Sequence, residues 1–309
     1  MHATLVHEPP LVSIVTACYN GAQFIEATIE SVLAQDYPRV EYIVMDGGST
    51  DETVDILAHY ESLFPSRIKY SWVSEKDNGA ADAVNRGFAR SSGEVFAYLH
   101  ADDILLPGAI SAAVRALEEN PQADVIYGGA FWIDEHGARI GAYPTRDFDS
   151  DLLAQECFIC QPASFIRRSA FDNAGGLDPA LQCAFDYELW MRLARAGDLQ
   201  RIDQDLAESR MHRTNKTLAL RHKAFQETFR ILKRHYGYVP FTYIYAYLCF
   251  RADGRDQFFE PFQPSAWRYL QSLPLGLAMN RSAIFKYLSE WSRVMSWSGL
   301  ARRISAKGV

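Results

Sequence analysis

Two adjacent aspartates, Asp102 and Asp103, follow a run of β-branched, aromatic and aliphatic residues at Val95–Leu99. Such an uninterrupted apolar run is typical of a central parallel strand that is buried on both faces. Ligands of open α/β sheets bind at the carboxyl ends of the strands, so we expect both carboxylates at a ligand-binding edge. Paired carboxylates repel each other unless a cation lies between them, and oxygen ligands suit Mg²⁺ or Mn²⁺. The structural alternative is that an aspartate caps the helix predicted after Pro107.

Four further polar side chains are expected at the same edge, each just after a strand or in the first turns of a helix: Tyr19, Asp46, Asp82 and Arg86. A tyrosine ring can stack on a nucleotide base, and a carboxylate can accept a hydrogen bond from a base N–H or a ribose hydroxyl. Asp46, Asp82 and Arg86 also have structural interpretations that need no ligand. Asp46 precedes two glycines and suits a turn, whereas Asp82 and Arg86 have the i, i+4 spacing of a helix pair.

The N-terminal third of the chain alternates between strand and helix patterns. Strands are predicted over residues 12–17, 42–45, 68–73 and 95–99, with apolar residues at helical spacing between them. Ser49 and Glu52 have the spacing of a capping box, which predicts that the second helix opens at Ser49. This alternation predicts an α/β fold with a mostly parallel sheet, helices on both of its faces and the loops gathered on one ligand-binding edge.

Composition and missing motifs exclude several classes of protein. The 309 residues are 48% hydrophobic, and 31 basic against 38 acidic side chains give a net charge of -7, which offers no general attraction to nucleic acid. The segment Thr16–Gly21 has one glycine, so the G-x-G-x-x-G fingerprint of dinucleotide-binding enzymes is absent, and no G-x-x-x-x-G-K-[ST] P-loop occurs. Five cysteines and no charged-then-apolar leader predict a reducing, cytoplasmic setting, with Cys157 and Cys160 as buried thiols.

Five segments carry a family resemblance through their order and spacing. They are Val12–Asn20 (VSIVTACYN), Tyr42–Asp51 (YIVMDGGSTD), Asn85–Gly87 (NRG), Ser92–Glu94 (SGE) and Leu99–Asp103 (LHADD). Together they resemble family 2 glycosyltransferases of the GT-A fold, over roughly residues 10–215. The resemblance implies an activated sugar donor, usually a nucleoside diphosphate sugar, bound with a divalent metal, Mn²⁺ or Mg²⁺, at a D-x-D-type motif.

Carried over by position, the resemblance gives roles to named residues. It implies contacts to the nucleotide sugar by Thr16, Ala17, Tyr19, Asp46, Asp82, Arg86, Ala101 and Asp102. Asp102 would also ligate the metal. His212 ends an Arg-x-His that the family often carries, and it could touch the metal or the leaving diphosphate. A solvated strand end is the structural alternative for His212.

Two positions depart from the family pattern. His100 stands where the D-x-D motif begins, and Gly47 replaces the second aspartate of the usual Asp-Asp-Gly-Ser turn. His100 could be a metal ligand that favours Mn²⁺, a donor that orients another ligand, or a packed residue at the end of the strand.

A second match to the family lies at Phe185–Leu193 (FDYELWMRL). Its apolar residues form an inward helical stripe, which leaves Asp186 in the first turn, facing the cleft. The resemblance implies that Asp186 is the catalytic base, with Phe185 in place of the glutamate of the customary Glu-Asp pair. The structural alternative for Asp186 is a helix cap.

The rest of the chain gives weaker signals. Asp124–Tyr127 and Phe131–Ile133 are predicted as separate strands, with a hairpin turn at His136 and Gly137. We place a GT-A catalytic domain at residues 1–215 and a mainly helical C-terminal region at 216–309. Residues 216–260 combine a basic amphipathic helix with an apolar run, Tyr238–Phe250, that is shorter than the roughly 20 residues of a membrane-spanning helix. This segment either packs on the catalytic domain or docks on an anionic membrane where a lipid-linked acceptor resides.

The expected function is the transfer of a sugar from a nucleoside diphosphate sugar to an acceptor hydroxyl, with inversion by a single displacement, in the synthesis of cell-surface polysaccharide or glycan. The acceptor would be a saccharide or a lipid-linked saccharide, and the enzyme would be cytoplasmic, with peripheral contact at the inner face of the membrane. One alternative is a non-catalytic nucleotide-sugar-binding module, which His100 and Phe185 could suggest. Another is a metal-dependent nucleotidyltransferase, which leaves Asp186 without a role.

Overall fold

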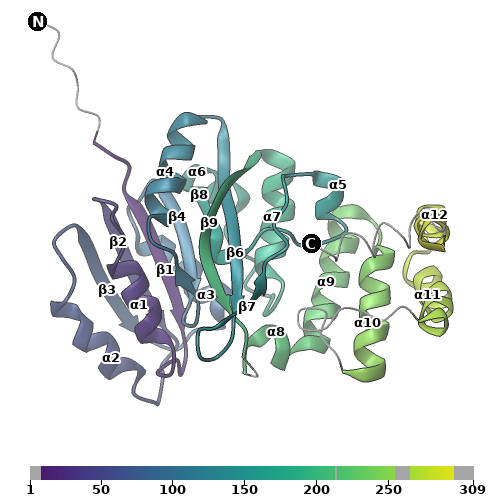
Figure 1. Ribbon diagram of the computed structural model, residues 1–309, viewed down its shortest axis with the longest axis horizontal. Coiled ribbons are helices and arrows are strands. Elements are labelled where there is room, and N and C mark those ends of the chain that lie inside the picture. The colour runs from purple at the N-terminus through teal and green to yellow at the C-terminus, as the bar shows by residue number, and fades with distance from the viewer. Residues whose placement is uncertain (1–7, 213, 255–264, 296–309) are drawn as a thin grey trace, which may run out of the picture. The chain divides into compact units, whose positions relative to one another are not determined.

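The computed structural model describes residues 8–212, 214–254 and 265–295. The chain forms two compact units, of which the first comprises Met1–Asp149 with Cys157–Asn215 and the second Ser150–Glu156 with Lys216–Val309. All of the labelled strands in Figure 1 belong to the first unit, whereas α5 and α8 to α12 belong to the second.

The first unit is built on one nine-stranded sheet (Figure 1). Its strands are β1 (Val12–Cys18), β2 (Val40–Asp46), β3 (Ile68–Ser74), β4 (Val95–His100), β5 (Ile104–Leu105), β6 (Ala123–Ile133), β7 (Arg139–Ala142), β8 (Ser164–Arg167) and β9 (Asp198–Arg210). The order is β3-β2-β1-β4-β8-β6-β9-β5, and β7 pairs with β6. β3, β2, β1 and β4 are mutually parallel, whereas β8 is antiparallel to β4 and β6. The predicted α/β class with a mostly parallel nucleotide-binding-type sheet is thus confirmed.

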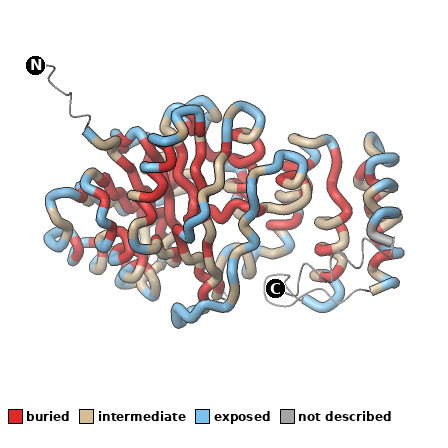
Figure 2. Tube along the Cα trace, turned by 45° about the horizontal axis from the view of Figure 1, so that its top comes forward, coloured by how far each residue is buried: buried red, intermediate tan, exposed pale blue. Residues whose placement is uncertain are grey.

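Helices lie on both faces of this sheet, as predicted. The described helices of the first unit are α1 (Ile25–Leu33), α2 (Thr53–His59), α3 (Ala80–Arg90), α4 (Ala109–Glu119), α6 (Arg168–Ala174) and α7 (Phe185–Ala196). α1 and α4 share a buried cluster with Ile14 and Val44, whose side chains point to one face. α3 packs on the opposite face, where Gly87 is so close to Val15 that a Cβ would lie 2.5 Å from its side chain. The strands between these layers are buried, which Figure 2 shows in red.

The strand register determines which side chains share the ligand-binding edge. Cys18 of β1 pairs with Asp46 of β2, and Asp46 pairs with Ser74 of β3. On the other side of β1, Ala17 pairs with His100 of β4. Because all four strands run parallel, the loops after these residues emerge together at one edge of the sheet.

Two local predictions were wrong. The two strands predicted at Asp124–Tyr127 and Phe131–Ile133 are one strand, β6, because Gly128 and Gly129 stay in the sheet where β9 approaches their backbone too closely for a side chain. The capping box is also absent: α2 starts at Thr53, and Ser49 bonds instead to Asp46. The amide of Thr53 donates to Asp51 Oδ1 at 3.1 Å, so Asp51 satisfies the helix start.

The second unit is helical. It contains α5 (Ser150–Leu153), α8 (Lys216–Ala219), α9 (Arg221–Tyr236), α10 (Phe241–Asp253), α11 (Ala266–Met279) and α12 (Ile284–Met295). Aromatic rings of α9 and α10 pack against each other, with Phe225 5.7 Å from Phe250 and Phe229 5.4 Å from Tyr247 between ring centroids. This contact lies within the second unit, so packing of residues 216–260 on the catalytic domain stays a prediction, and residues 255–260 lie outside the described residues. Within the described ranges, the helices are too short or too polar to cross a bilayer.

Candidate active site

A surface cavity of about 330 Å³ opens at the carboxyl ends of β1, β2 and β3. It is lined by Tyr19, Gly47, Gly48, Lys76 and Asp77. Tyr19, which the sequence singled out, has a side chain that is 63% exposed and free to meet a flat ligand. Lys76 and Asp77 were not predicted, although a polar run after the third strand was the available signal.

Asp46 ends β2 beside this cavity but is only 1% exposed. Its Oδ2 accepts hydrogen bonds from the amides of Gly48 (3.1 Å) and Ser49 (2.9 Å) and from the Ser74 hydroxyl (2.6 Å). Its Oδ1 accepts a further bond from the Ser49 hydroxyl. The turn interpretation of Asp46 therefore holds, and most of its acceptor capacity is occupied within the protein.

The glycines after Asp46 have physical reasons to be there. A Cβ at position 47 would lie 2.8 Å from Asp77 Oδ2, and Gly48 has φ +84°, in the left-handed region. A side chain at position 47 would therefore require the Asp77 carboxylate to move.

Thr16 and Ala17 lie on β1 beneath this edge. Thr16 is fully buried, and its hydroxyl is 3.1 Å from the Tyr42 hydroxyl inside the sheet. Ala17 is nearly buried, and the following loop passes close to Ala101, since a Cβ on Gly21 would lie 3.2 Å from that of Ala101. The structure thus brings Ala17, Tyr19 and Ala101 to one edge, while the Thr16 side chain faces the interior.

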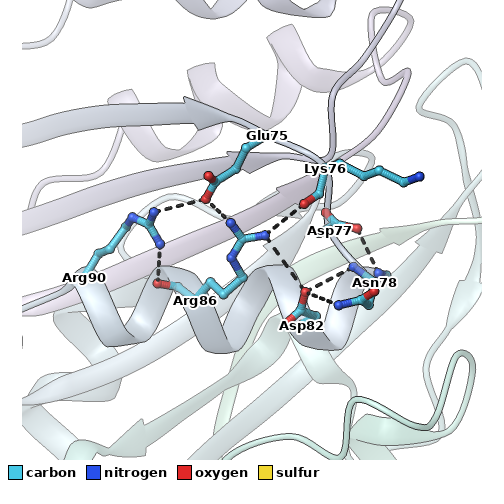
Figure 3. Close-up of polar contacts among 8 residues, drawn as sticks. Glu75, Lys76, Asp77, Asn78, Asp82, Arg86 and Arg90 are labelled. Carbon is cyan, nitrogen blue, oxygen red and sulfur yellow. Dashed lines mark hydrogen bonds and ion pairs between the residues drawn. The ribbon is translucent and has the colours of Figure 1, made fainter.

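The predicted residues Asp82 and Arg86 stabilise the loop that borders the cavity (Figure 3). Asp82 accepts from the amide of Asn78 at 3.0 Å and lies 3.9 Å from Arg86. Arg86 donates to the Lys76 carbonyl at 3.2 Å and pairs with Glu75. Both residues hold residues 75–79 in place, and the i, i+4 pair expected from the sequence is present, though it is only part of the network.

Asp102 and His212 meet although 110 positions separate them. His212 Nε2 lies 2.9 Å from Asp102 Oδ2, and both side chains are partly exposed. His212 is held by two further contacts, a 2.9 Å approach of Nδ1 to the Thr214 hydroxyl and a ring contact with Phe24 at 4.7 Å. The fold therefore brings together the two residues that the sequence analysis named as metal ligands, and their role stays a prediction.

Arg210 positions the Asp102 turn, a role that the sequence did not reveal. It is 4% exposed, and its Nε donates to the Asp102 carbonyl at 3.1 Å while its Nη1 donates to the Asp134 carbonyl at 2.9 Å. Its amide donates to Asp103 Oδ1 at 3.2 Å. Burial and the adjacent Asp102 carboxylate raise the pKa of Asp103 well above its usual range. The Asp103 side chain therefore bonds within the protein interior rather than to a ligand.

Asp102 and His212 suit a divalent cation by donor type but do not enclose one. A carboxylate oxygen and an imidazole nitrogen are ligands for Mn²⁺, and the carboxylate alone suits Mg²⁺. Within the described part of the chain, no three His, Cys, Asp or Glu side chains converge to hold a metal. A cation here would complete its coordination with water and with phosphate oxygens of a ligand, which is common for Mg²⁺.

Asp186 lies in the first turn of α7, where the sequence placed it. The N-cap position is Ala184, and Asp186 Oδ1 accepts from the amide of Tyr187 at 2.7 Å. Burial raises the pKa of Asp186 to about 6, against hydrogen bonds that act in the opposite direction. α7 is fixed by Arg192, which donates to the Gly176 carbonyl at 2.7 Å and pairs with Glu188. A carboxylate with this pKa is suited to accept a proton near neutral pH.

Two of the three departures from the family pattern, His100 and Phe185, contact each other. The rings of His100 and Phe185 meet edge to face, with 5.9 Å between centroids. Phe185 is buried, so His100 packs at the strand end as one of its three interpretations expected. The contact also brings the first turn of α7, and hence Asp186, next to the end of β4.

Comparison with known sequences gives relatives that are named as glycosyltransferases. An uncharacterized glycosyltransferase of Rickettsia felis is 31% identical over 218 residues, covering 66% of this chain and 34% of that protein. One from Mycobacterium tuberculosis H37Rv is 34% identical over 188 residues, covering 60% of this chain and 69% of the relative. This chain therefore spans about a third of the length of the Rickettsia felis protein.

Two solved structures share the fold. S. aureus TarS 1-349, in complex with UDP-GlcNAc, superposes with a TM-score of 0.59 at 16% identity, over 88% of this chain and 74% of the TarS 1-349 chain. The mannosyltransferase PcManGT from Pyrobaculum calidifontis, in complex with GDP-Man and Mn²⁺, gives 0.56 at 18% identity, over 98% and 81%. The family model described as "Glycosyl transferase family 2" matches residues 13–175, more than half of the sequence. The chain therefore belongs to glycosyl transferase family 2.

Proposed function

We propose that the protein is a glycosyltransferase that moves a sugar from a nucleoside diphosphate sugar to an acceptor hydroxyl, with inversion by a single displacement. The observation that carries the proposal is the contact between His100 and Phe185, because it sets Asp186 beside the strand end that leads into Asp102. A proton acceptor and a site for the leaving diphosphate would then flank one reaction centre.

The donor nucleotide would bind in the cavity at the ends of β1 to β3. The exposed ring of Tyr19 offers a face for the base, and Asp77 offers acceptors for base N–H groups or ribose hydroxyls. Ala17 and Ala101 would line the same edge, and Asp82 and Arg86 would support the Lys76–Asp77 loop. Asp46 would act mainly by holding the turn, with one further acceptor position towards the ligand.

A divalent cation, Mn²⁺ or Mg²⁺, would be held by Asp102 and His212 together with the donor diphosphate, and it would supply positive charge for the leaving group. The protein's own contribution is to orient these two side chains. Arg210 fixes the backbone of Asp102, and Phe24 fixes the ring of His212. The complexes of the structural neighbours with UDP-GlcNAc, and with GDP-Man and Mn²⁺, support this assignment of the donor class.

Asp186 would take the proton of the acceptor hydroxyl as that oxygen bonds to the anomeric carbon. A sugar hydroxyl is too weak an acid to attack unaided at neutral pH, and a carboxylate whose pKa is about 6 is ionised there yet still basic. Attack from the side opposite the leaving diphosphate inverts the anomeric configuration. The acceptor would be a saccharide or a lipid-linked saccharide in cell-surface glycan synthesis, on the cytoplasmic side.

The catalytic domain would comprise residues 1–215 apart from the short segment Ser150–Glu156, which belongs to the second unit. The test is a screen of UDP, GDP and dTDP sugars for thermal stabilisation with and without Mn²⁺, followed by a transfer assay. We expect one nucleotide at about 100 times its Kd to stabilise the fold by about 2.7 kcal/mol, and only with the metal present. If the whole panel gave neither stabilisation nor transfer, the proposal would be wrong.

A further inference from the structure

The connection between β7 and β8 contains a segment, Ser150–Glu156, that folds with the C-terminal helices instead of the sheet. The chain therefore passes between the two units at three places, after Asp149, after Glu156 and after Asn215. Leu153 of α5 is fully buried, so the segment is built into its surroundings. A helical region joined to the first unit at one end alone would need a single passage. The second unit thus has a further hold on the chain of the first.

Gln155 is bonded to the C-terminal helices through both its side chain and its backbone. Its Nε2 donates to the Tyr238 hydroxyl and to Glu290 Oε1, each at 3.0 Å, and its carbonyl accepts from the Thr242 hydroxyl at 3.0 Å. Glu290 Oε2 also accepts from the amide of Phe241 at 3.1 Å, so its carboxylate lies at the start of α10. Gln155 is therefore held where α10 and α12 are themselves joined by a hydrogen bond.

Two residues further along, the chain is bonded within the first unit. The Tyr143 hydroxyl donates to the Cys157 carbonyl at 3.0 Å, and the next residue, Phe158, is fully buried. Glu156 alone separates Gln155 from Cys157, and one residue of extended chain spans at most about 3.6 Å. A shift of Gln155 by a few ångströms therefore has to displace Cys157 or break its bond to Tyr143.

From Cys157 the chain runs to Gln161, which bonds to the last part of β4. The ladder between β8 and β4 covers the first two residues of β4. The Gln161 side chain continues it, since its Nε2 donates to the carbonyl of Tyr98, two residues further along β4. Gln161 is buried, so this bond is shielded from water. The segment 157–161 therefore supports the end of β4.

The end of β4 leads to Asp186. The ring of His100 lies 6.2 Å from that of Tyr98 and 5.9 Å from that of Phe185, between centroids. Burial raises the pKa of the Cys160 thiol well above its usual range, with smaller contributions that include the Asp186 carboxylate. The cavity proposed for the donor nucleotide lies elsewhere, at the ends of β1, β2 and β3. The segment thus borders the proposed proton acceptor rather than the nucleotide.

We propose that Gln155 is a positioning residue for the transfer reaction, through which the second unit holds the segment 157–161 beside Asp186 and so shapes the acceptor site. The link runs along the chain itself, from the hydrogen bonds of Gln155 to that of Cys157. Its role in transfer rests on the proposed function, in which Asp186 takes a proton from the acceptor. Loosening Gln155 should therefore impair use of the acceptor and leave donor binding unchanged.

Alkylation of Cys157 by iodoacetamide reports on the segment without any sugar transfer. Gln155→Glu sets a second carboxylate against Glu290, and it should raise the alkylation rate of Cys157, measured by mass spectrometry, by about tenfold or more. Cys183, which is also half-buried, should react at the wild-type rate and is the internal reference. Gln271→Glu, the same change at an exposed site of α11, is the matched control and should leave both rates unchanged.

The double variant Gln155→Glu, Glu290→Gln tests the pairing itself. It exchanges donor and acceptor: the new amide at position 290 can donate to the new carboxylate at position 155, and its oxygen can still accept from the amide of Phe241. The alkylation rate of Cys157 should return to within about threefold of that of the wild type. A substitution that merely loosens the fold would not be rescued by a second one.

Steady-state kinetics test the role in transfer, with the donor from the thermal screen and a para-nitrophenyl glycoside as acceptor. Gln155→Glu should raise the KM for the glycoside by about tenfold and keep the nucleotide Kd within about twofold, and the double variant should restore the KM. If Gln155→Glu melts early, Gln155→Leu removes the side-chain hydrogen bonds without adding charge and gives the same comparisons.

Three results would overturn the proposal: Cys157 alkylation at the wild-type rate in both single variants, no rescue by the double variant, or a donor affinity that falls together with use of the acceptor. A wild type that transfers no sugar would contradict the proposed function, and with it the role of Gln155 in transfer. The alkylation rates would still decide whether Gln155 positions the segment, so the two failures are distinguishable.

Discussion

Asp46 is the last residue of β2 and Asp102 lies two positions past the end of β4, and both strands pair with β1, yet the surroundings of the two carboxylates differ. Asp46 is 1% exposed and accepts four hydrogen bonds from Gly48, Ser49 and Ser74. Asp102 is partly exposed, and its carboxylate faces His212, with the backbone held separately by Arg210. In the turn after β2, the Asp46 carboxylate accepts hydrogen bonds from the backbone of its own turn. In the turn after β4, Arg210 fixes the backbone of Asp102, which leaves the Asp102 carboxylate available.

This difference shows that position at a strand end does not by itself make a carboxylate functional. A carboxylate has about four acceptor sites, so four internal donors leave little for a ligand. Asp186 extends the comparison to a third carboxylate, which accepts from the first turn of α7 and has a raised pKa. The expected consequences of changing each of the three therefore differ in kind.

The largest expected effect is that of Asp102→Ala. Loss of this carboxylate should lower transfer by about 10³-fold or more and remove metal-dependent nucleotide binding, since neutralising the diphosphate is worth several kcal/mol. Calorimetry with Mn²⁺ and the cognate nucleotide checks the binding, and the thermal midpoint should stay close to that of the wild type. Unchanged nucleotide affinity in the variant would contradict the metal role.

Asp186→Asn should reduce kcat by about 10²-fold or more while leaving donor affinity nearly unchanged, because the amide keeps the shape but accepts no proton. Steady-state kinetics and nucleotide titration separate the two. Asp172→Asn, an exposed aspartate that pairs with Arg168, serves as the matched control. A helix cap would behave differently: asparagine caps about as well as aspartate, so a variant with normal rate would identify Asp186 as structural.

The pH profile gives a smaller and independent measure. Since burial raises the pKa of Asp186 to about 6, kcat should fall about tenfold per unit below that pH and level off above it. Because the pKa of Asp186 is raised in the folded state, its protonated carboxyl group contributes to the free energy of unfolding at low pH. This contribution to stability is lost as the pH rises through about 6. An acidic limb that persists in Asp186→Asn would assign the titration to another group.

Asp46→Ala should act on stability more than on catalysis. Its removal leaves buried donors of the turn without their acceptor, which should cost on the order of 3 kcal/mol in the free energy of unfolding. Urea titration of the variant measures this loss, with Asp172→Ala as a surface control expected within about 0.5 kcal/mol of the wild type. If stability were unchanged and nucleotide affinity fell instead, the direct contact that the family resemblance assigns to Asp46 would outweigh its turn role.

Much of the fold was predictable because it depends on local patterns. The apolar runs at Val12, Tyr42 and Val95 became parallel strands that are buried on both faces, which requires such runs, and the run at Ile68 became the parallel edge strand β3, which is less buried. Two strands were predicted where β6 is a single strand, because Gly128 and Gly129 separate its apolar runs and glycine usually weakens a strand. Both positions are glycine because β9 lies too close to their backbone for a side chain. β9 comes from a distant part of the sequence, so no local pattern predicts this contact.

The candidate site was predictable by residue type but not by environment. Asp46, Asp102 and Asp186 were all identified, yet only the folded chain shows how many donors each one meets. Arg210 was given no role in the sequence analysis, because that role depends on carbonyls more than 70 positions away. Lys76 and Asp77 were missed because the loop that carries them was expected only as a connection.

The ring contact between His100 and Phe185 has a consequence for the history of the family. Phe185 is buried and His100 is half-buried, so an acidic residue at either position would place a charge against an uncharged aromatic ring. The two positions should therefore have changed together. Relatives with aspartate at the position of His100 should carry a polar residue at that of Phe185, and those with an aromatic ring at one should carry a ring at the other. Reverting either alone should be less tolerated than reverting both, so the pair would be inherited as a single trait.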